Sequence, residues 1–137
     1  MSADLQWMIL RNTSSFIVKK RNIKKFFSKE PLNPKNIHSP RYTGTIHKKA
    51  FTVEPHPGGK GVNLVYKKRK YQNRPDKNIA RVQFTRDARR TMTGIKKFVN
   101  SNRYRRDLKM LALRRASAIL RSQRPVVPKK GQRKKAD

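Results

Sequence analysis

Apolar and polar residues follow different patterns in different parts of the chain, and the first third contains only short regular segments. Ser2 is a suitable N-cap for a helix over residues 3–10, most of which are apolar. A helix this short is not stable alone, so we expect it to dock on the rest of the fold. Short strands are predicted at 16–18 and around 26–27. Residues 19–40 otherwise hold several lysines and three prolines, and they predict an irregular basic loop.

Residues 41–84 have the spacing expected of antiparallel strands. Apolar side chains are spaced among polar ones up to Val53, and the apolar run at 62–66 follows a segment rich in proline and glycine at 56–61. This pattern predicts a hairpin with a loop of about four to six residues. After a polar loop at 71–78, residues 79–84 alternate apolar and polar with a period of two, as a half-buried strand does.

The last third has helical periodicity. Thr85 can cap a first helix whose apolar residues recur every three to four positions up to Val99. Gly94 weakens such a helix by about 1 kcal/mol relative to Ala, which predicts close packing at that point. A second helix is expected over about 105–123, with an apolar stripe on one side and arginines on the other, and Pro125 ends it.

These patterns together predict an α+β fold. A small antiparallel β-sheet from residues 15–84 is expected to pack with the short N-terminal helix and the two C-terminal helices. Residues 1–126 are expected to form a single domain that includes the irregular basic loop region at 19–40. Residues 127–137 are expected to be a basic C-terminal tail with almost nothing to bury.

The net charge decides the class of partner. The chain has 137 residues and carries 37 Lys and Arg against 7 Asp and Glu, for a formal net charge of +30. Within a compact domain, so many positive side chains repel one another. A polyanion is its natural counterpart, because neutralised phosphates release their condensed counterions. Hydrophobic residues make up only 34 %, so we expect a thin core that is stable mainly when bound.

The lack of cysteine and the character of the first residues indicate the cellular compartment in which the protein is used. The sequence has no cysteine, which excludes disulfide-stapled secreted proteins and Cys-based zinc modules. The first residues lack the basic segment and apolar run of a secretory signal, and no stretch has the length of a membrane span. We expect the chain to be made and used on the cytosolic or nuclear side, with no membrane partner.

Basic residues form clusters in every segment of the chain. A single cluster is as easily a solvated face as a binding site. Clusters on all sides suit a protein wedged among several RNA segments, whereas a DNA-binding protein usually concentrates its charge on one face or one helix. The predicted RNA-binding residues are Lys19, Lys20, Arg21, Lys48, Lys49, Lys67, Lys68, Arg69, Lys70, Arg103, Arg105, Arg106, Arg114, Arg115, Arg121 and Arg124.

For three residues near these clusters, the sequence is compatible with more than one role. Tyr71 and Tyr104 are candidates for stacking on unpaired bases, and packing within the protein is the alternative. Arg115 falls within the apolar stripe of the last helix. It either snorkels to solvent or directs its guanidinium at a phosphate.

The sequence offers little for catalysis, and we expect no enzyme. The glycine-rich run at 58–61 lacks the G-x-x-x-x-G-K-[ST] pattern of a phosphate loop and is better explained as a turn. His38, His47 and His56 could in principle supply acid and base for RNA cleavage, but His38 and His56 lie beside prolines in expected loops, where no carboxylate is expected to orient them. Metal-ligand clusters are missing as well, so no metal, cofactor or small-molecule substrate is expected.

Several short runs of the sequence stand in an order that is typical of one known family. The runs are Leu5-Gln6-Trp7-Met8, Arg11-Asn12, Ser14-Ser15-Phe16, Arg41-Tyr42, Val53-Glu54-Pro55, Gly59-Lys60-Gly61-Val62, Tyr104-Arg105 and the run from Arg114 to Gln123. The match covers most of residues 1–126 and is densest at 104–126, but it does not extend to 19–40, to 67–80 or to the tail. In these runs the chain resembles the eukaryotic large-subunit ribosomal proteins numbered twenty-eight.

The resemblance implies a structural constituent of the cytoplasmic large (60S) ribosomal subunit that supports cytoplasmic translation. Its implied partners are large-subunit ribosomal RNA and neighbouring large-subunit ribosomal proteins, with assembly in the nucleolus. A chromatin or DNA-binding architectural protein is the alternative from another class. Tails of such proteins are usually of low complexity, whereas this chain has a defined β region that contains aromatic residues.

Overall fold

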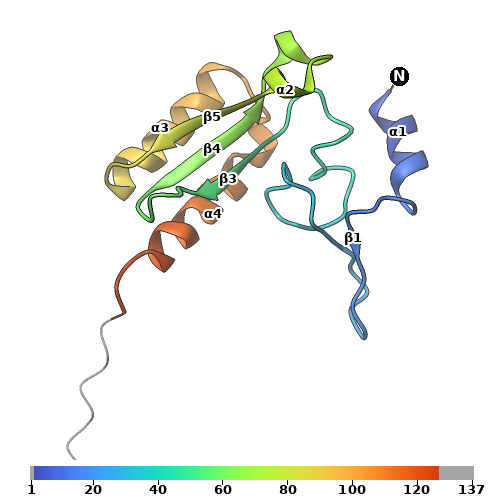
Figure 1. Cartoon of the computed structure of the whole chain (residues 1–137), viewed down its shortest axis with the longest axis horizontal. Helices are drawn as coiled ribbons and strands as arrows, with labels where there is room; N and C mark the ends of the chain where they lie inside the picture. Colours follow the sequence, from blue (N-terminus) through green and yellow to red (C-terminus); the bar gives the residue numbers. More distant parts are fainter. Residues whose placement is uncertain (1, 127–137) are drawn as a thin grey trace, which may run out of the picture.

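The structure is a computed structural model that describes residues 2–126, so the predicted tail at 127–137 lies outside the described residues. Figure 1 shows a sheet backed by two helices, and beside it an N-terminal part of short elements and loops. The N-terminal elements are α1 (Ala3–Leu10), β1 (Ile17–Val18) and β2 (Phe27–Ser28). The second part consists of β3 (Phe51–Pro55), β4 (Val62–Lys67), the 3-10 turn η1 (Arg69–Tyr71), α2 (Pro75–Asn78), β5 (Ile79–Phe84), α3 (Ala88–Ser101), the 3-10 turn η2 (Arg106–Leu108) and α4 (Lys109–Ser122).

Strands β3, β4 and β5 form a three-stranded antiparallel sheet in that order. The hairpin pairs Pro55 of β3 with Val62 of β4, and Val62 in turn pairs with Phe84 of β5. In the hairpin loop Gly61 has a φ of 96°, and a Cβ there would lie 2.3 Å from the Phe84 carbonyl oxygen, so only glycine fits. The predicted hairpin and the predicted strand at 79–84 are confirmed.

One face of the sheet packs against α3 and α4, and this layer forms the core. Small residues let these elements approach closely. A Cβ on Gly94 would lie 2.5 Å from a ring carbon of Phe84, which confirms the close packing predicted at this glycine. The side chain of Gln123 ties the end of α4 to the hairpin loop, with 2.8 Å hydrogen bonds to both the amide and the carbonyl of Gly61. The buried cluster consists of Phe51, Val53, Val62, Leu64, Ile95, Val99, Tyr104, Leu108, Ala112 and Ala116.

The other face of β4 is covered by residues 29–50, which have little regular structure. Val65 packs there in a second, smaller apolar cluster with two residues of this segment. Buried polar groups hold the segment in place: the Thr43 hydroxyl lies 2.9–3.0 Å from both carboxylate oxygens of Glu30. Asn33 is 1 % exposed and hydrogen-bonds three backbone groups of the turn that follows it. Side-chain hydrogen bonds thus satisfy backbone groups that have no strand partner.

The α+β class and the two C-terminal helices are confirmed, but the N-terminal part differs from the expectation. β1 and β2 form a separate two-stranded antiparallel sheet instead of joining the larger one. α1 does not cover the three-stranded sheet and lies apart from it (Figure 1), with the ring of Trp7 4.7 Å from that of His38. The reason is that the faces of β4 are already occupied by α3 and α4 on one side and by residues 29–50 on the other.

Both C-terminal helices begin later than predicted. Asp87, not Thr85, caps α3, because its carboxylate accepts a hydrogen bond from the amide of Arg90 at 3.2 Å. α4 begins at Lys109, after η2, because Arg103 and Arg105 have the left-handed φ values of 45° and 43° that reverse the chain between the two helices.

Candidate nucleic-acid interface

Three basic clusters that are far apart in the sequence come together at one end of the sheet. This is where β3 begins and β4 ends, and the turn between α3 and α4 lies beside it. The contact is direct, because the Tyr104 hydroxyl lies 3.1 Å from the amide of Ala50 and 2.8 Å from the carbonyl of Lys67. We call this surface the basic end. It is defined by the exposed side chains of Lys48, Lys68, Arg69, Lys70, Arg74, Lys77, Arg103 and Arg106.

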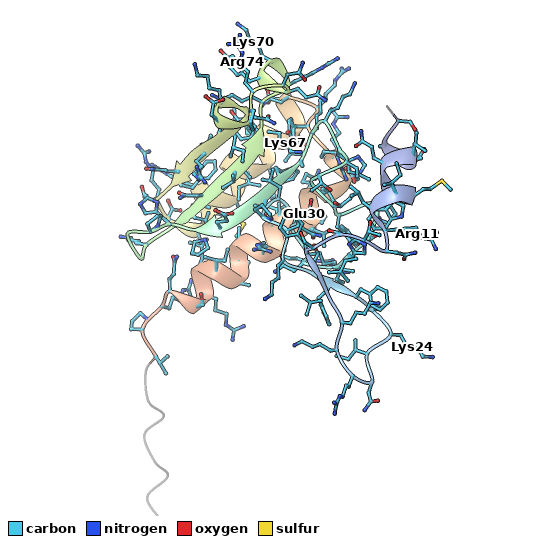
Figure 2. The ribbon with its side chains drawn as sticks, turned by 45° about the vertical axis from the view of Figure 1, so that its right-hand side comes forward. Arg11, Lys24, Glu30, Lys67, Lys70 and Arg74 are labelled. Atoms are coloured by element: carbon cyan, nitrogen blue, oxygen red, sulfur yellow. The ribbon has the colours of Figure 1, made fainter. Side chains whose placement is uncertain are left out.

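The segment 68–78 folds back on itself and concentrates charge at the basic end. The amide of Lys68 donates to the Asn78 carbonyl at 2.7 Å, which closes the segment at its base. Within it, η1 and α2 make two tight turns, and Pro75 starts α2 at a position that suits proline. Figure 2 shows the side chains of Lys70 and Arg74 at the far tip of this segment. Five cations therefore project from eleven residues at the end of the sheet.

Tyr71 provides an aromatic surface within this charged segment. It is half-buried, and the ammonium groups of Lys68 and Lys70 each lie 5.8 Å from its ring centroid. Residues 69–74 line a hollow of about 440 Å³ beside the ring. An aromatic ring flanked by cations is the arrangement that stacks on an unpaired base while the cations bind its phosphates. This geometry is compatible with the predicted stacking by Tyr71, which stays a prediction.

Within residues 2–126, no cation of the basic end forms an ion pair with an acidic side chain. The three ion pairs found within residues 2–126 are Arg41–Asp107, Arg90–Asp87 and Arg105–Asp107, and none includes a residue of the basic end. Like charges held this close repel one another, which costs stability in the free chain. A bound polyanion removes this cost.

Tyr104, by contrast, is a core residue, and the prediction that it stacks on RNA is corrected. Its side chain is 7 % exposed, and its ring packs among those of Phe51, Tyr66 and Phe98. Burial raises the pKa of its phenol to about 12, although its hydrogen bonds to the backbone of Ala50 and Lys67 act in the opposite direction. A ring enclosed in this way has no face to offer a base.

Lys67 points toward the protein instead of toward solvent, so this geometry does not favour its predicted role in RNA binding, which stays a prediction. Its ammonium group donates hydrogen bonds to the carbonyls of Gly44 and His47, which fastens the 29–50 segment to β4. Figure 2 shows Lys67 between the sheet and this segment, with Glu30 below it. Burial lowers the pKa of Lys67, and the carboxylate of Glu30 opposes this shift. The alternation along β4 turns Lys67 inward, whereas Lys68 lies beyond the strand and is exposed.

Two predicted arginines are likewise used inside the protein. Arg115 donates to the carbonyls of Val53 at 2.7 Å and Pro34 at 3.0 Å, so its guanidinium is held inside the protein, and its predicted contact with a phosphate stays a prediction. Burial lowers its pKa, against the attraction of Glu54. Arg105 donates to the Arg41 carbonyl at 2.7 Å and pairs with both oxygens of Asp107.

The remaining predicted residues lie on two other surfaces. Lys19, Lys20 and Arg21 belong to the β1–β2 hairpin, which projects away from the sheet near the labelled Lys24 (Figure 2). Arg114, Arg121 and Arg124 are exposed along the outer side of α4 and just beyond it. Lys49 is half-buried, with its ammonium 5.7 Å from the Tyr104 ring centroid. Most of the exposed predicted residues thus lie on three surfaces, and the basic end holds more exposed cations than either of the other two.

Sequence reasoning missed Arg74 and Lys77, which belong to the basic end. Both lie in a segment that was predicted to be a polar loop. The signal that could have placed them is Pro75 followed by Asp76, a typical start of a short helix that folds the loop back toward Lys70.

The three histidines each have a hydrogen-bond partner that orients them structurally. Ring nitrogens lie 2.8 Å from the Arg11 carbonyl for His38, 2.7 Å from the Pro40 carbonyl for His47, and 3.0 Å from the Asn63 side chain for His56. Across residues 2–126 no three His, Cys, Asp or Glu side chains gather as a metal site would need. In the same range no helix has both the length and the apolar character to cross a membrane.

Comparison with known proteins finds matches over nearly the whole length of the chain. The model of the Ribosomal L28e protein family matches residues 5–122, from α1 to the end of α4. The chain is 35 % identical to the large ribosomal subunit protein eL28 of Caenorhabditis elegans, over 90 % of this chain and 91 % of that protein. It is 33 % identical to the protein of the same name from Schizosaccharomyces pombe, over 91 % of this chain and 95 % of that protein. The chain described here therefore belongs to the Ribosomal L28e protein family.

Proposed function

We propose that this chain is a structural constituent of the eukaryotic large (60S) ribosomal subunit. It acts in cytoplasmic translation by holding ribosomal RNA in place and catalyses no reaction itself. The relatives named above are large ribosomal subunit proteins, and the present chain spans almost their whole length. The observation that carries the RNA-binding part is the basic end, where exposed cations from three separate segments gather and Lys68 and Lys70 flank the half-buried ring of Tyr71.

The proposed mechanism is electrostatic clamping with little reading of base edges. Lys and Arg side chains of the basic end contact phosphates of RNA strands that meet there, and Tyr71 stacks on an unpaired base. The α4 arginines and the β1–β2 hairpin contact further RNA segments on other sides. Neighbouring large-subunit proteins complete the site, and assembly begins in the nucleolus. A single chain thereby fixes the relative positions of several RNA segments.

Sedimentation tests the proposed location. A tagged chain is expected to co-sediment with large subunits on a sucrose gradient and to remain there after a moderate salt wash, because many phosphate contacts must be broken together. Recovery only in light fractions, or with chromatin, would contradict the proposal. The second outcome would favour the DNA-binding alternative.

A matched pair of variants tests the proposed RNA surface. The first replaces Lys68, Arg69, Lys70 and Arg74 by Gln. The control replaces four exposed cations on or just before α3 by Gln, namely Arg86, Arg89, Lys96 and Lys97. Each lost phosphate contact lowers the slope of log K against log salt by about 0.7–0.9. The first variant is expected to lower it by about 3 when binding to large-subunit RNA is measured, and the control by much less. Equal slopes for the two variants would show that the basic end is not the RNA-binding surface.

A further inference from the structure

The N-terminal helix α1 is mostly apolar and yet unburied. None of its residues is buried, and Leu5, Met8 and Ile9 are 50, 68 and 58 % exposed. These three side chains lie on one side of the helix, because they are spaced at i, i+3 and i+4. The apolar side of a helix is normally packed against other protein, and a helix of eight residues is not stable alone. Within residues 2–126, the exposed side of α1 has no partner.

The seating of α1 fixes which side remains exposed. Trp7 stacks against His38, whose ring nitrogen lies 2.8 Å from the carbonyl of Arg11 just beyond the helix. Ala3 and Gln6 line a hollow that α1 shares with residues 45–48. Rotating Met8 and Ile9 inward would break these contacts.

The distribution of charge indicates the class of partner. All 37 Lys and Arg lie after residue 10, and the single charged side chain of α1 is the acidic Asp4. RNA is a poor match, because the side chains of Leu5, Met8 and Ile9 offer neither cations to phosphates nor hydrogen-bond donors to bases, and the first cation, Arg11, lies just beyond the helix. A second copy of the chain is also a poor match, because two chains of formal charge +30 repel each other. An apolar patch on a different protein fits, and a lysine or arginine at its edge would meet Asp4.

We propose that the Leu5, Met8 and Ile9 side of α1 is a docking surface for an apolar patch on another protein of the large subunit. This inference rests on the proposed function and divides the contacts of the chain: the basic end binds RNA and α1 binds protein. Three side chains form a small contact by themselves. They are sufficient here because RNA binding holds the two proteins at a high effective concentration.

Photocrosslinking in intact large subunits tests the partner class. A photoreactive residue placed at Met8 is expected to give a crosslink to a different protein that survives ribonuclease. The same residue placed at Lys70 is expected to give a product that ribonuclease shortens. Crosslinks from Met8 to RNA alone, to a second copy of this chain, or to nothing while the Lys70 position reacts, would each overturn the docking surface. Absence of the chain from large subunits would instead overturn the proposed function, and the inference with it.

A matched pair of double variants tests the energetics. Met8→Gln with Ile9→Gln keeps helix propensity, because Gln is at least as good a helix former as Ile and close to Met. The control, Met110→Gln with Val126→Gln, changes residues that are 55 and 93 % exposed outside α1. In competition with the parent chain, the α1 variant is expected to lose about tenfold or more in large-subunit incorporation, as expected when buried apolar contacts are lost. Its affinity for purified ribosomal RNA should be unchanged, and the control should match the parent in both assays. Equal incorporation of the two variants would overturn the inference.

Discussion

Removing the Tyr104 hydroxyl from the core tests which residues near the basic end stabilise the fold and which bind RNA. Tyr104→Phe deletes the oxygen that accepts from the Ala50 amide at 3.1 Å and donates toward the Lys67 carbonyl at 2.8 Å. These two bonds join the start of β3 and the end of β4 to the turn between α3 and α4. The ring and its aromatic neighbours remain in place.

The expected loss follows from the group that is left without a partner. Ala50 is 2 % exposed, so water cannot readily replace the hydroxyl at its amide. An unsatisfied buried donor costs about 1–3 kcal/mol, and we expect the free energy of unfolding to fall by that amount. Tyr104→Ala removes the ring as well and should cost about 3–5 kcal/mol, the range for large aromatic truncations in a core.

Urea unfolding at high ionic strength is the assay, because salt screens the repulsion within the chain. The comparison variant is Tyr71→Ala. It should leave the free energy of unfolding nearly unchanged and weaken binding to single-stranded ribosomal RNA by about 1–3 kcal/mol for one lost stacking contact. Tyr104→Phe should do the reverse, lowering stability while the folded protein binds RNA as the parent does.

The same variant isolates a pH effect. Burial raises the pKa of the Tyr104 phenol to about 12. The neutral phenol therefore contributes stability that is fully present below about pH 10, the ordinary tyrosine pKa, and is lost as the pH rises toward 12. Tyr104→Phe should remove this part of the alkaline destabilisation. If Tyr104→Phe lowers RNA affinity without changing the free energy of unfolding, the ring belongs to the RNA surface and the reasoning is wrong.

Three other predictions concern the helices and the free chain. Replacing Arg106, Arg114 and Arg121 together by Gln should lower large-subunit incorporation in competition with the parent, while the circular dichroism spectrum stays the same. Equal incorporation would show that α4 only supports the fold and does not bind RNA. Gly94→Ala should lower the thermal midpoint. The reason is that its Cβ would lie 2.5 Å from the Phe84 ring, and overpacking of about 1–3 kcal/mol exceeds the helix-propensity gain of about 1 kcal/mol; a raised midpoint would show that the ring moves freely. The isolated chain should be partly unfolded at low salt and gain structure when RNA is added, so a cooperative melt of the free chain above about 60 °C would contradict the expected thin core.

Periodicity was enough to locate most regular elements of the second half. The alternation at 79–84 and the glycine-rich turn before Val62 define β5 and the hairpin, because both reflect local geometry that the residues themselves impose. Gly94 was informative for the same reason, since a glycine within an apolar helix stripe marks a close approach. The short strands at 16–18 and 26–27 were also located by composition, although their pairing into a separate sheet was not.

The direction of individual basic side chains could not be read from the sequence. Lys67 and Lys68 are adjacent and chemically identical, but only the end of β4 determines that one points inward and the other outward. Arg115 was recognised as unusual in an apolar stripe, yet its carbonyl partners come from β3 and from residue 34, which are distant in sequence. Tyr104 and Tyr71 both lie beside basic clusters, and tertiary packing alone distinguishes the ring in the core from the half-buried one.

Ultraviolet crosslinking of intact large subunits, followed by mass spectrometry of the peptides of this chain that carry nucleotides, shows which surface binds RNA. Peptides spanning residues 68–77 are expected to carry RNA, with Tyr71 among the crosslinked positions. The peptide containing Leu5, Met8 and Ile9 is expected to carry none. Nucleotides found on the exposed side of α3 and absent from residues 68–77 would show that the basic end is not the RNA-binding surface.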